Sequence, residues 1–144
     1  MSTKYAVKII NGVDVEALSE TIESVRHDPS LGKSEFRVCN KWINGGYNRS
    51  VVDEFYSAGQ EQEHRGAFSL DADEPELLAG TDKGANPVEH LLHALAACMT
   101  TSMVYHAAVR GVKIDEIESE LKGQLDLRGF TGLSNDVRKG YSEI

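Results

Sequence analysis

One segment constrains the fold more than any other, because it contains both ends and the apolar body of a long helix. Asn86 can cap the first turn, and Pro87 suits the first helical position because its missing N–H would have no partner there. Glu89 stands where a capping box needs a carboxylate, and Gly111 can end the helix in a left-handed conformation. The residues between are apolar around most of the circumference, so the sequence predicts a buried central helix over residues 86–110.

The chain before this helix predicts a short helix followed by an antiparallel meander. Asp14 can cap a helix within an N-terminal helical extension, residues 1–33. Apolar and polar residues then alternate, which is typical of half-buried strands, and the Asn-Gly-Gly run that begins at Asn44 is a hairpin signal. We therefore expect a β-meander over residues 34–71, with a polar loop at residues 60–64 before its third strand.

The segments that flank the central helix on its C-terminal side predict further β structure. Residues 72–85 are acidic and rich in turn residues, so they form the connecting loop. Strict alternation predicts a long strand with one wet face over residues 113–128. Residues 129–144 read as a loop and the start of another strand. We expect residues 1–144 to form a single α+β domain.

Composition excludes several classes of function. Acidic residues outnumber basic ones, 23 to 15, and the net charge of -8 would repel nucleic acids and anionic membrane surfaces. No stretch approaches the roughly 20 apolar residues that span a bilayer, and the N-terminus lacks the apolar core of a signal peptide. These features favour a cytoplasmic protein that binds neither nucleic acid nor membrane.

Cys98, in the middle of the predicted helix, is the best candidate for a reactive group. A free cysteine is often only a small buried hydrophobe, and that interpretation stays open. A reactive thiol needs a cation or hydrogen-bond donors that stabilise its thiolate, because a position in mid-helix gains nothing from the helix dipole. Three arginines before the helix could supply that cation: Arg37, Arg49 and Arg65.

Two other groups of residues carry weaker signals. Strand alternation places Cys39 between Arg37 and Lys41 on one face, which would make its thiol mildly reactive if the face is exposed, although an incidental surface cysteine explains it as well. His90 and His93 have the spacing of a shared metal site, but no third ligand completes a recognised set. We expect no metal, and no nucleotide motif indicates a cofactor.

Residues 68–129 resemble the central motif block of the OsmC/Ohr-like thiol proteins. In that family an Asn-Pro pair starts a helix that carries a cysteine about three turns later and ends at a glycine before a long strand. Asn86, Pro87, Cys98 and Gly111 occupy these positions. The resemblance implies an OsmC-like fold, in which antiparallel sheets surround long central helices in an intertwined homodimer with its sites at the subunit boundary.

The resemblance also implies an activity. In the peroxidase members of the family, the helix cysteine attacks the O–O bond of an organic hydroperoxide, and an arginine from the first hairpin stabilises its thiolate. Cys98 would take the first role, and Arg49, in a segment similar to that hairpin (residues 41–50), is the nearest match for the second. The implied partners are a hydroperoxide and an external thiol reductant.

Two departures from the family pattern leave an alternative open. Val88 stands where peroxidase members have a glutamate, and the family's C-terminal region, with its resolving cysteine, would follow Ile144, so we expect that part of the fold to be missing. The sequence therefore supports two functions. One is thiol-dependent reduction of organic hydroperoxides; the other is an OsmC-fold dimer without turnover that binds small apolar molecules or is a truncated, inactive homologue.

Overall fold

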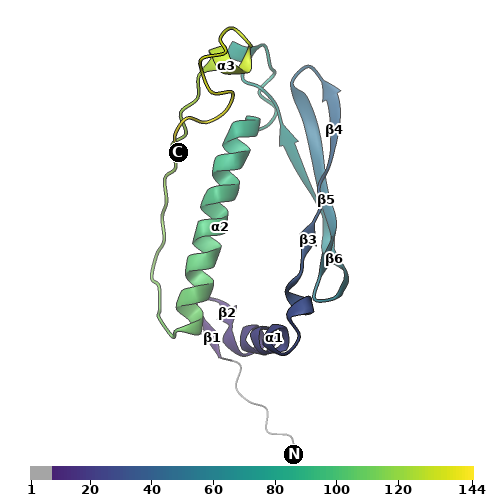
Figure 1. The fold of residues 1–144 in the computed structure, drawn as a ribbon, viewed down its shortest axis with the longest axis vertical. Coiled ribbons are helices and arrows are strands. Elements are labelled where there is room, and N and C mark those ends of the chain that lie inside the picture. The colour runs from purple at the N-terminus through teal and green to yellow at the C-terminus, as the bar shows by residue number, and fades with distance from the viewer. Residues whose placement is uncertain (1–7) are drawn as a thin grey trace, which may run out of the picture.

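The structure, a computed structural model, describes residues 8–144. Its N-terminal unit is a small hairpin followed by a helix (Figure 1): β1 (Ile9–Ile10), β2 (Val13–Asp14) and α1 (Val15–His27). Asn11 and Gly12 make the turn with φ of 52° and 78°, a backbone that the Asn-Gly pair favours. The Asp14 carboxylate accepts hydrogen bonds from two N–H groups of the first turn of α1, so the predicted cap is confirmed. A short 3-10 turn, η1 (Pro29–Gly32), follows α1.

The β-meander is confirmed as an antiparallel sheet. Its members are β3 (Glu35–Phe36), β4 (Cys39–Asn44), β5 (Tyr47–Ser57) and β6 (Gln60–Ala72), and β5 pairs with the other three. The α+β class with antiparallel sheets is thus confirmed.

The polar loop predicted at residues 60–64 is wrong, because these residues form the beginning of β6. The turn lies earlier, at Ala58 and Gly59, whose φ values are 52° and 80°. Polar side chains do not interrupt a strand that has water on one face, which is why polarity alone misplaced the turn.

The central helix, α2 (Pro87–Val109), has the predicted ends. Asn86 is its N-cap: the Asn86 side chain accepts from the N–H of Val88, and the Glu89 carboxylate accepts from the N–H of Asn86. Gly111 has φ of 72° just after the C-cap. The loop before α2 contains one 3-10 turn, η2 (Glu76–Leu78).

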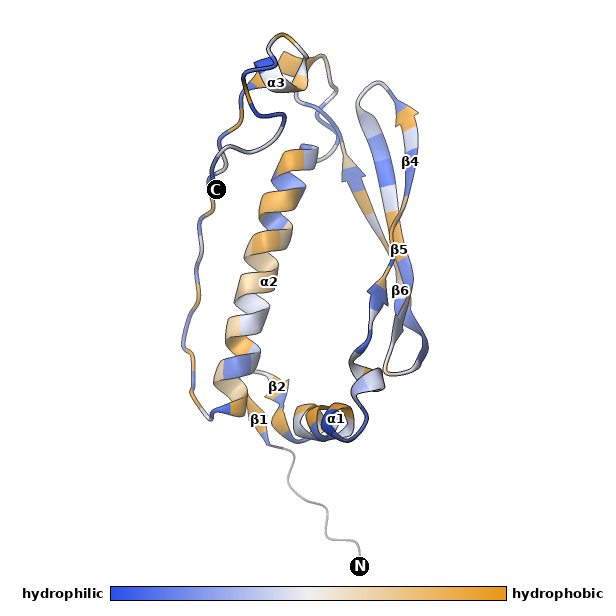
Figure 2. Ribbon diagram, in the orientation of Figure 1, coloured by the Kyte–Doolittle hydropathy of each residue, from blue (hydrophilic) through white to orange (hydrophobic). Residues whose placement is uncertain are grey.

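The predicted burial of α2 is wrong for the single chain. Hydrophobic residues recur along the whole helix (Figure 2), yet the side chains of Met99 and Met103 are 51% and 52% exposed. The reason is architectural: α2 contacts α1 at one end, while the sheet stands apart from it along most of its length (Figure 1). Of the described hydrophobic residues only Val15 and Ala108 are buried.

The long strand predicted over residues 113–128 is also wrong for the single chain. This segment runs beside α2 without a paired strand (Figure 1) and ends in the short helix α3 (Leu127–Phe130). Its alternation matches the pattern of a strand, but a strand also needs a neighbour for its backbone hydrogen bonds. The predicted strand at the end of residues 129–144 is reduced to one isolated bridge between Gln124 and Glu143.

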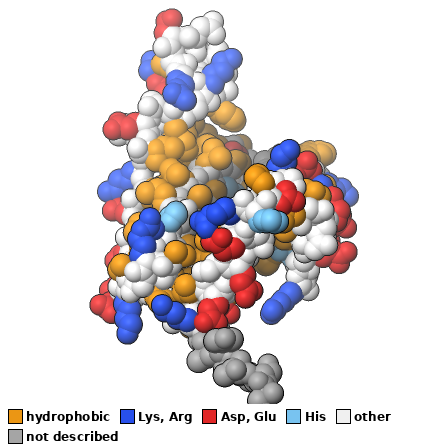
Figure 3. Space-filling view, turned by 60° about the horizontal axis from the view of Figure 1, so that its bottom comes forward, with side chains coloured by type: hydrophobic (Ala, Val, Ile, Leu, Met, Phe, Trp, Pro, Cys, Tyr) orange, Lys and Arg blue, Asp and Glu red, His pale blue; other side chains and the backbone are white. Residues whose placement is uncertain are grey.

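The chain has far more accessible surface than a compact monomer of its size. It exposes 11515 Å² for a mass of 15.8 kDa, whereas a compact monomer of this mass exposes about 7,300 Å². A group of hydrophobic side chains is visible on this surface (Figure 3). Of the helices in residues 8–144, none combines the length and the apolar character needed to cross a bilayer.

Candidate functional site

Cys98 lies on the middle of α2 with its side chain exposed. It follows Ala94 by one helical turn, displaced by about 40° around the axis, so the two side chains share one stripe of the helix. The expectation of a buried sulfur is therefore wrong for the single chain, for the same reason as the expectation of a buried helix. A thiol in this position is open to small molecules.

The N-terminal half of α2 faces the sheet across a groove of about 340 Å³, which we call the α2–sheet groove. Alternate residues of a strand point to opposite faces of the sheet. The face that lines the groove carries Asn48 and Ser50 of β5 and Leu70 of β6. On the helix side, the groove is lined by His90, His93 and Ala94, among others. Because Ala94 is a lining residue, the stripe that carries Cys98 starts in this groove.

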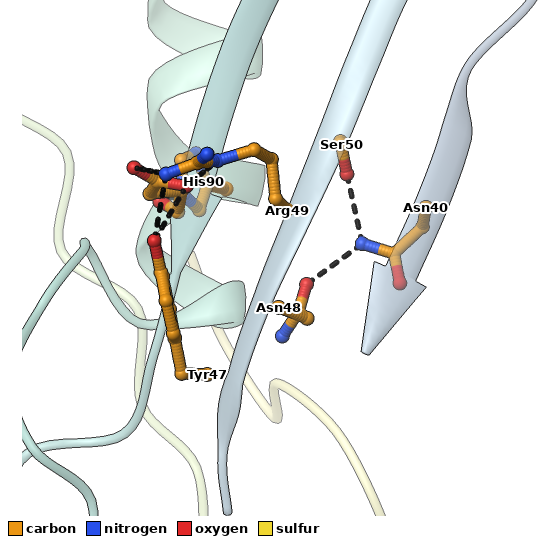
Figure 4. Close-up of polar contacts among 7 residues, drawn as sticks. Asn40, Tyr47, Asn48, Arg49, Ser50 and His90 are labelled. Atoms are coloured by element: carbon orange, nitrogen blue, oxygen red, sulfur yellow. Dashed lines mark hydrogen bonds and ion pairs between the residues drawn. The ribbon is translucent and has the colours of Figure 1, made fainter. Parts of the chain in front are cut away.

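The strand side of the α2–sheet groove contains a small polar network (Figure 4). The amide Nδ2 of Asn40 donates to Oδ1 of Asn48 at 2.7 Å and to Oγ of Ser50 at 2.9 Å. On the helix side, Nε2 of His90 lies 3.0 Å from the backbone oxygen of Asp71. A neutral His90 must carry its proton on Nε2 to make this bond, which fixes its tautomer and ties α2 to β6.

Arg49 lies on the opposite face of the sheet and is bonded to Asp71 and Tyr47 there. Its Nε and Nη2 donate to the two carboxylate oxygens of Asp71 at 2.6 and 3.0 Å, and Nη2 also donates to the hydroxyl of Tyr47 at 2.8 Å (Figure 4). The bond from Arg49 lowers the pKa of Asp71, and the same carboxylate raises the pKa of Arg49. Within one chain the structure does not bring Arg49 to Cys98.

The other two candidate cations also belong to the region of the sheet. Arg37 donates to Glu61 and Glu35, and these bonds, that to Glu61 first, raise the pKa of the guanidinium. Arg65 belongs to β6. Across residues 8–144, no hydrogen bond or ion pair involves the sulfur of Cys98.

The comparison with known protein families concerns α2 and the residues around and after it. Residues 80–144 match the sequence model of the OsmC-like protein family. This part of the chain is similar to that family. The match covers α2 with its cysteine, and it supports the family resemblance inferred from Asn86, Pro87, Cys98 and Gly111. No curated protein matches the chain.

Cys39 lies outside the OsmC-like segment, on the outer face of the sheet. Its side chain is exposed beside a second hollow of about 300 Å³, lined also by Arg37, Val51, Asp53 and Glu54. The predicted face shared with Arg37 is confirmed, but the guanidinium is bonded to carboxylates. Among the described residues, no cluster of three or more His, Cys, Asp and Glu is arranged to hold a metal ion.

Sequence reasoning missed the residues that hold Arg49. Tyr47 precedes it by two positions, so strand periodicity alone places both on one face, and that signal was available. Asp71 lies 22 positions away and became a neighbour only through the register in which Arg49 pairs with Asp71. No local pattern in the sequence specifies that register.

Proposed function

We propose that this OsmC-like protein reduces organic hydroperoxides through the thiol of Cys98. The observation that carries the proposal is the position of Cys98: an accessible sulfur on the helix of the matched segment, one turn beyond a groove whose walls are partly apolar. A groove with apolar walls suits the alkyl or aryl part of a hydroperoxide.

The reaction needs no cofactor. The thiolate of Cys98 attacks the O–O bond, takes one oxygen to become a sulfenic acid, and leaves an alkoxide that gains a proton to become the alcohol. A thiol of an external dithiol then condenses with the sulfenic acid, and water leaves. The second thiol of the reductant breaks the mixed disulfide, so that Cys98 is regenerated and the reductant becomes a disulfide.

We further propose that the working form is a homodimer. Large exposed apolar side chains lie on both α2 and the sheet, among them Met99, Met103, Trp42 and Phe68. The surface in excess of a compact monomer is about 4,000 Å² per chain, ample for the 2,000–5,000 Å² that obligate dimers bury. A second copy of the chain supplies matching apolar surface. Its arrival would also place new side chains near Cys98, and Arg49 of one chain or the other is our candidate for the cation at the thiolate.

The enzymatic proposal is tested by hydroperoxide consumption with dithiothreitol as reductant. Cys98→Ser should reduce the consumption of cumene hydroperoxide to the uncatalysed rate, whereas Cys39→Ser, which removes the other thiol, should leave it unchanged. Equal rates for wild type and Cys98→Ser would exclude the proposal.

The cation is tested by the rate at which iodoacetamide alkylates Cys98 at neutral pH. Arg49→Gln should slow this alkylation by about tenfold, because a thiolate without a nearby cation is less populated. Arg37→Gln and Arg65→Gln are the matched controls. If one of the controls slows the reaction and Arg49→Gln does not, the assignment of Arg49 is wrong.

A second function is favoured by a separate observation. A cavity of about 190 Å³ lies where the start of α2 meets α3, and its walls are mainly apolar: Leu78, Pro87, Val88, Leu125, Leu127 and Phe130. Val88 stands here where peroxidases of the family have glutamate. These features suit a dimer that binds a small apolar molecule without turnover. In that case Cys98→Ser would leave ligand binding intact, and no hydroperoxide would be consumed.

A further inference from the structure

The chain contains the dipeptide Asn-Gly twice, each time preceded by isoleucine and each time at the turn of a hairpin. Asn11 and Gly12 join β1 to β2, whereas Asn44 ends β4 and Gly45 begins the turn to β5. Asparagine reacts readily with its own backbone in this dipeptide, because glycine has no side chain that crowds its amide nitrogen or restricts its rotation. The two copies offer the same local chemistry, so their surroundings in the fold are what distinguishes them.

The amide group of the Asn11 side chain is held by both of its polar atoms. Its Nδ2 donates to the backbone oxygen of Val112 at 2.9 Å, and its Oδ1 accepts from the N–H of Ile114 at 3.0 Å. These bonds join the first hairpin to the segment that follows α2 (Figure 1), so they come from the fold and not from the turn itself. A rotation of this amide toward the nitrogen of Gly12 must break both bonds.

The side chain of Asn44 has no such support. It is exposed at the tip of the second hairpin and makes no hydrogen bond to any residue of the described range 8–144. Its backbone pairs with Tyr47, but the register shifts between Trp42 and Asn44, so the strand pairing is irregular just before the turn. The indole of Trp42 donates to the backbone oxygen of Gly45 at 3.0 Å, which holds the peptide group after Gly45 and not the one before it. The Asn44 amide is therefore free to rotate toward the nitrogen of Gly45.

We propose that Asn44 is a site of spontaneous deamidation in the folded protein and that Asn11 is protected from it. The backbone nitrogen of Gly45 loses its proton to hydroxide and attacks Cγ of Asn44. The new C–N bond closes a succinimide ring, and the side-chain nitrogen takes a proton from water and leaves as ammonia. Water then opens the ring at either carbonyl carbon, which gives aspartate or isoaspartate. Water is the co-reactant, and nothing is oxidised or reduced.

The reaction changes the hairpin tip in charge and in backbone length. Each event adds a negative charge to a chain whose net charge is -8. In the isoaspartate form, the backbone before Gly45 also runs through the β carbon and is longer by that atom. The tip has little room, because a Cβ on Gly46 would lie 2.9 Å from Oδ1 of Asp73. The new carboxylate thus arises close to the loop that carries Asp73 and Glu74, and like charges repel.

Peptide mapping by mass spectrometry tests the proposal on the full-length protein. After incubation in weakly alkaline buffer, the peptide that contains Asn44 should appear in aspartate and isoaspartate forms. The peptide that contains Asn11 should react more slowly by about tenfold or more, because two hydrogen bonds must first break. In concentrated urea the fold is lost, so both sites should react at the same rate. Equal rates in the folded protein would overturn the proposal, and so would a difference that persists in urea, since it would come from the local sequence.

Asn44→Gln is the matched control, because a glutamine side chain would have to close a larger ring that forms much more slowly. On ion exchange, the wild type should develop a more acidic species during the incubation, and Asn44→Gln should not. An acidic species that accumulates equally fast in Asn44→Gln would place the reactive amide elsewhere and exclude Asn44 as the site.

Discussion

At the scale of single residues, Asp73 organises the loop that leads into α2. Its side chain is only 1% exposed. One carboxylate oxygen accepts from the N–H of Glu74 at 2.8 Å, and the other accepts from the Thr81 hydroxyl at 2.6 Å and from the N–H groups of Thr81 and Lys83. Four donors converge on one carboxylate, so this side chain replaces the backbone pairing that the loop lacks.

These bonds determine how the stability of the protein depends on acid. The Thr81 hydroxyl, and then the backbone donors, lower the pKa of Asp73 from its ordinary value of 3.8. A carboxyl whose pKa is lower in the folded protein stabilises the fold above its unfolded pKa, and this contribution is lost as the pH falls through the folded pKa. Asp73→Asn should therefore lower the melting temperature at pH 7, with a deficit that shrinks below about pH 4.

Thermal unfolding of wild type and Asp73→Asn between pH 7 and pH 3 provides the measurement. Asp136→Asn is a suitable control, because Asp136 is exposed near the end of the chain. A deficit that stays constant down to pH 3 would mean that Asp73 acts through its shape and not through its charge.

At the scale of elements, the start of α2 is fixed by a close approach of two backbones. Ala85 pairs with Ala72 at the edge of β6, and a Cβ on Gly84 would lie 2.4 Å from the backbone oxygen of Asp71. The same oxygen accepts a hydrogen bond from Nε2 of His90. Only glycine permits this contact, so the position of α2 relative to the sheet depends on Gly84.

Gly84→Ala should destabilise the protein by about 1–3 kcal/mol, because the two backbones must separate to admit the methyl group. Gly66→Ala is the matched control within β6, since a Cβ there meets nothing within 4 Å. Urea unfolding measures both. Equal stability of the two variants would show that the helix and β6 do not need this contact.

The elements that sequence predicted well are those whose signals are local. The cap at Asn86, the stop at Gly111 and the hairpin after Asn44 each depend on a few neighbouring residues, and the structure contains all three. The hairpin at Asn11 and Gly12 carried an equally local signal that was overlooked. Local capping and turn chemistry is therefore sufficient for most of the element boundaries.

What depends on distant partners could not be predicted. Alternation over residues 113–128 indicates which side chains share a face, but it does not supply the neighbouring strand. The same limit applies to the site. Cys98 was found from its helix and its family motif, whereas the engagement of Arg49 with Asp71 follows from strand register.

At the scale of the whole molecule, α2 leaves both apolar side chains and the thiol of Cys98 exposed in the single chain. The face of the sheet that lines the α2–sheet groove also carries Phe36, Trp42 and Phe68, which are all more than half exposed. Monomeric proteins rarely leave apolar surface of this extent open to water. A second copy that covers α2 and this sheet face would both complete the core and change the surroundings of Cys98.

A single charge on α2 distinguishes a homodimer from a stable monomer. Met103→Glu is harmless in an isolated chain, where this side chain is half exposed, but in the dimer it would bury an unpaired carboxylate at a cost of at least about 3 kcal/mol. The dissociation constant should then rise by about 100-fold or more. Leu133→Glu is the control, because Leu133 is 78% exposed and lies beyond α3. Sedimentation equilibrium should find wild type and Leu133→Glu dimeric under conditions where Met103→Glu is monomeric. A wild type that is monomeric at micromolar concentration would exclude the dimer, and with it any catalytic cation supplied by a second chain.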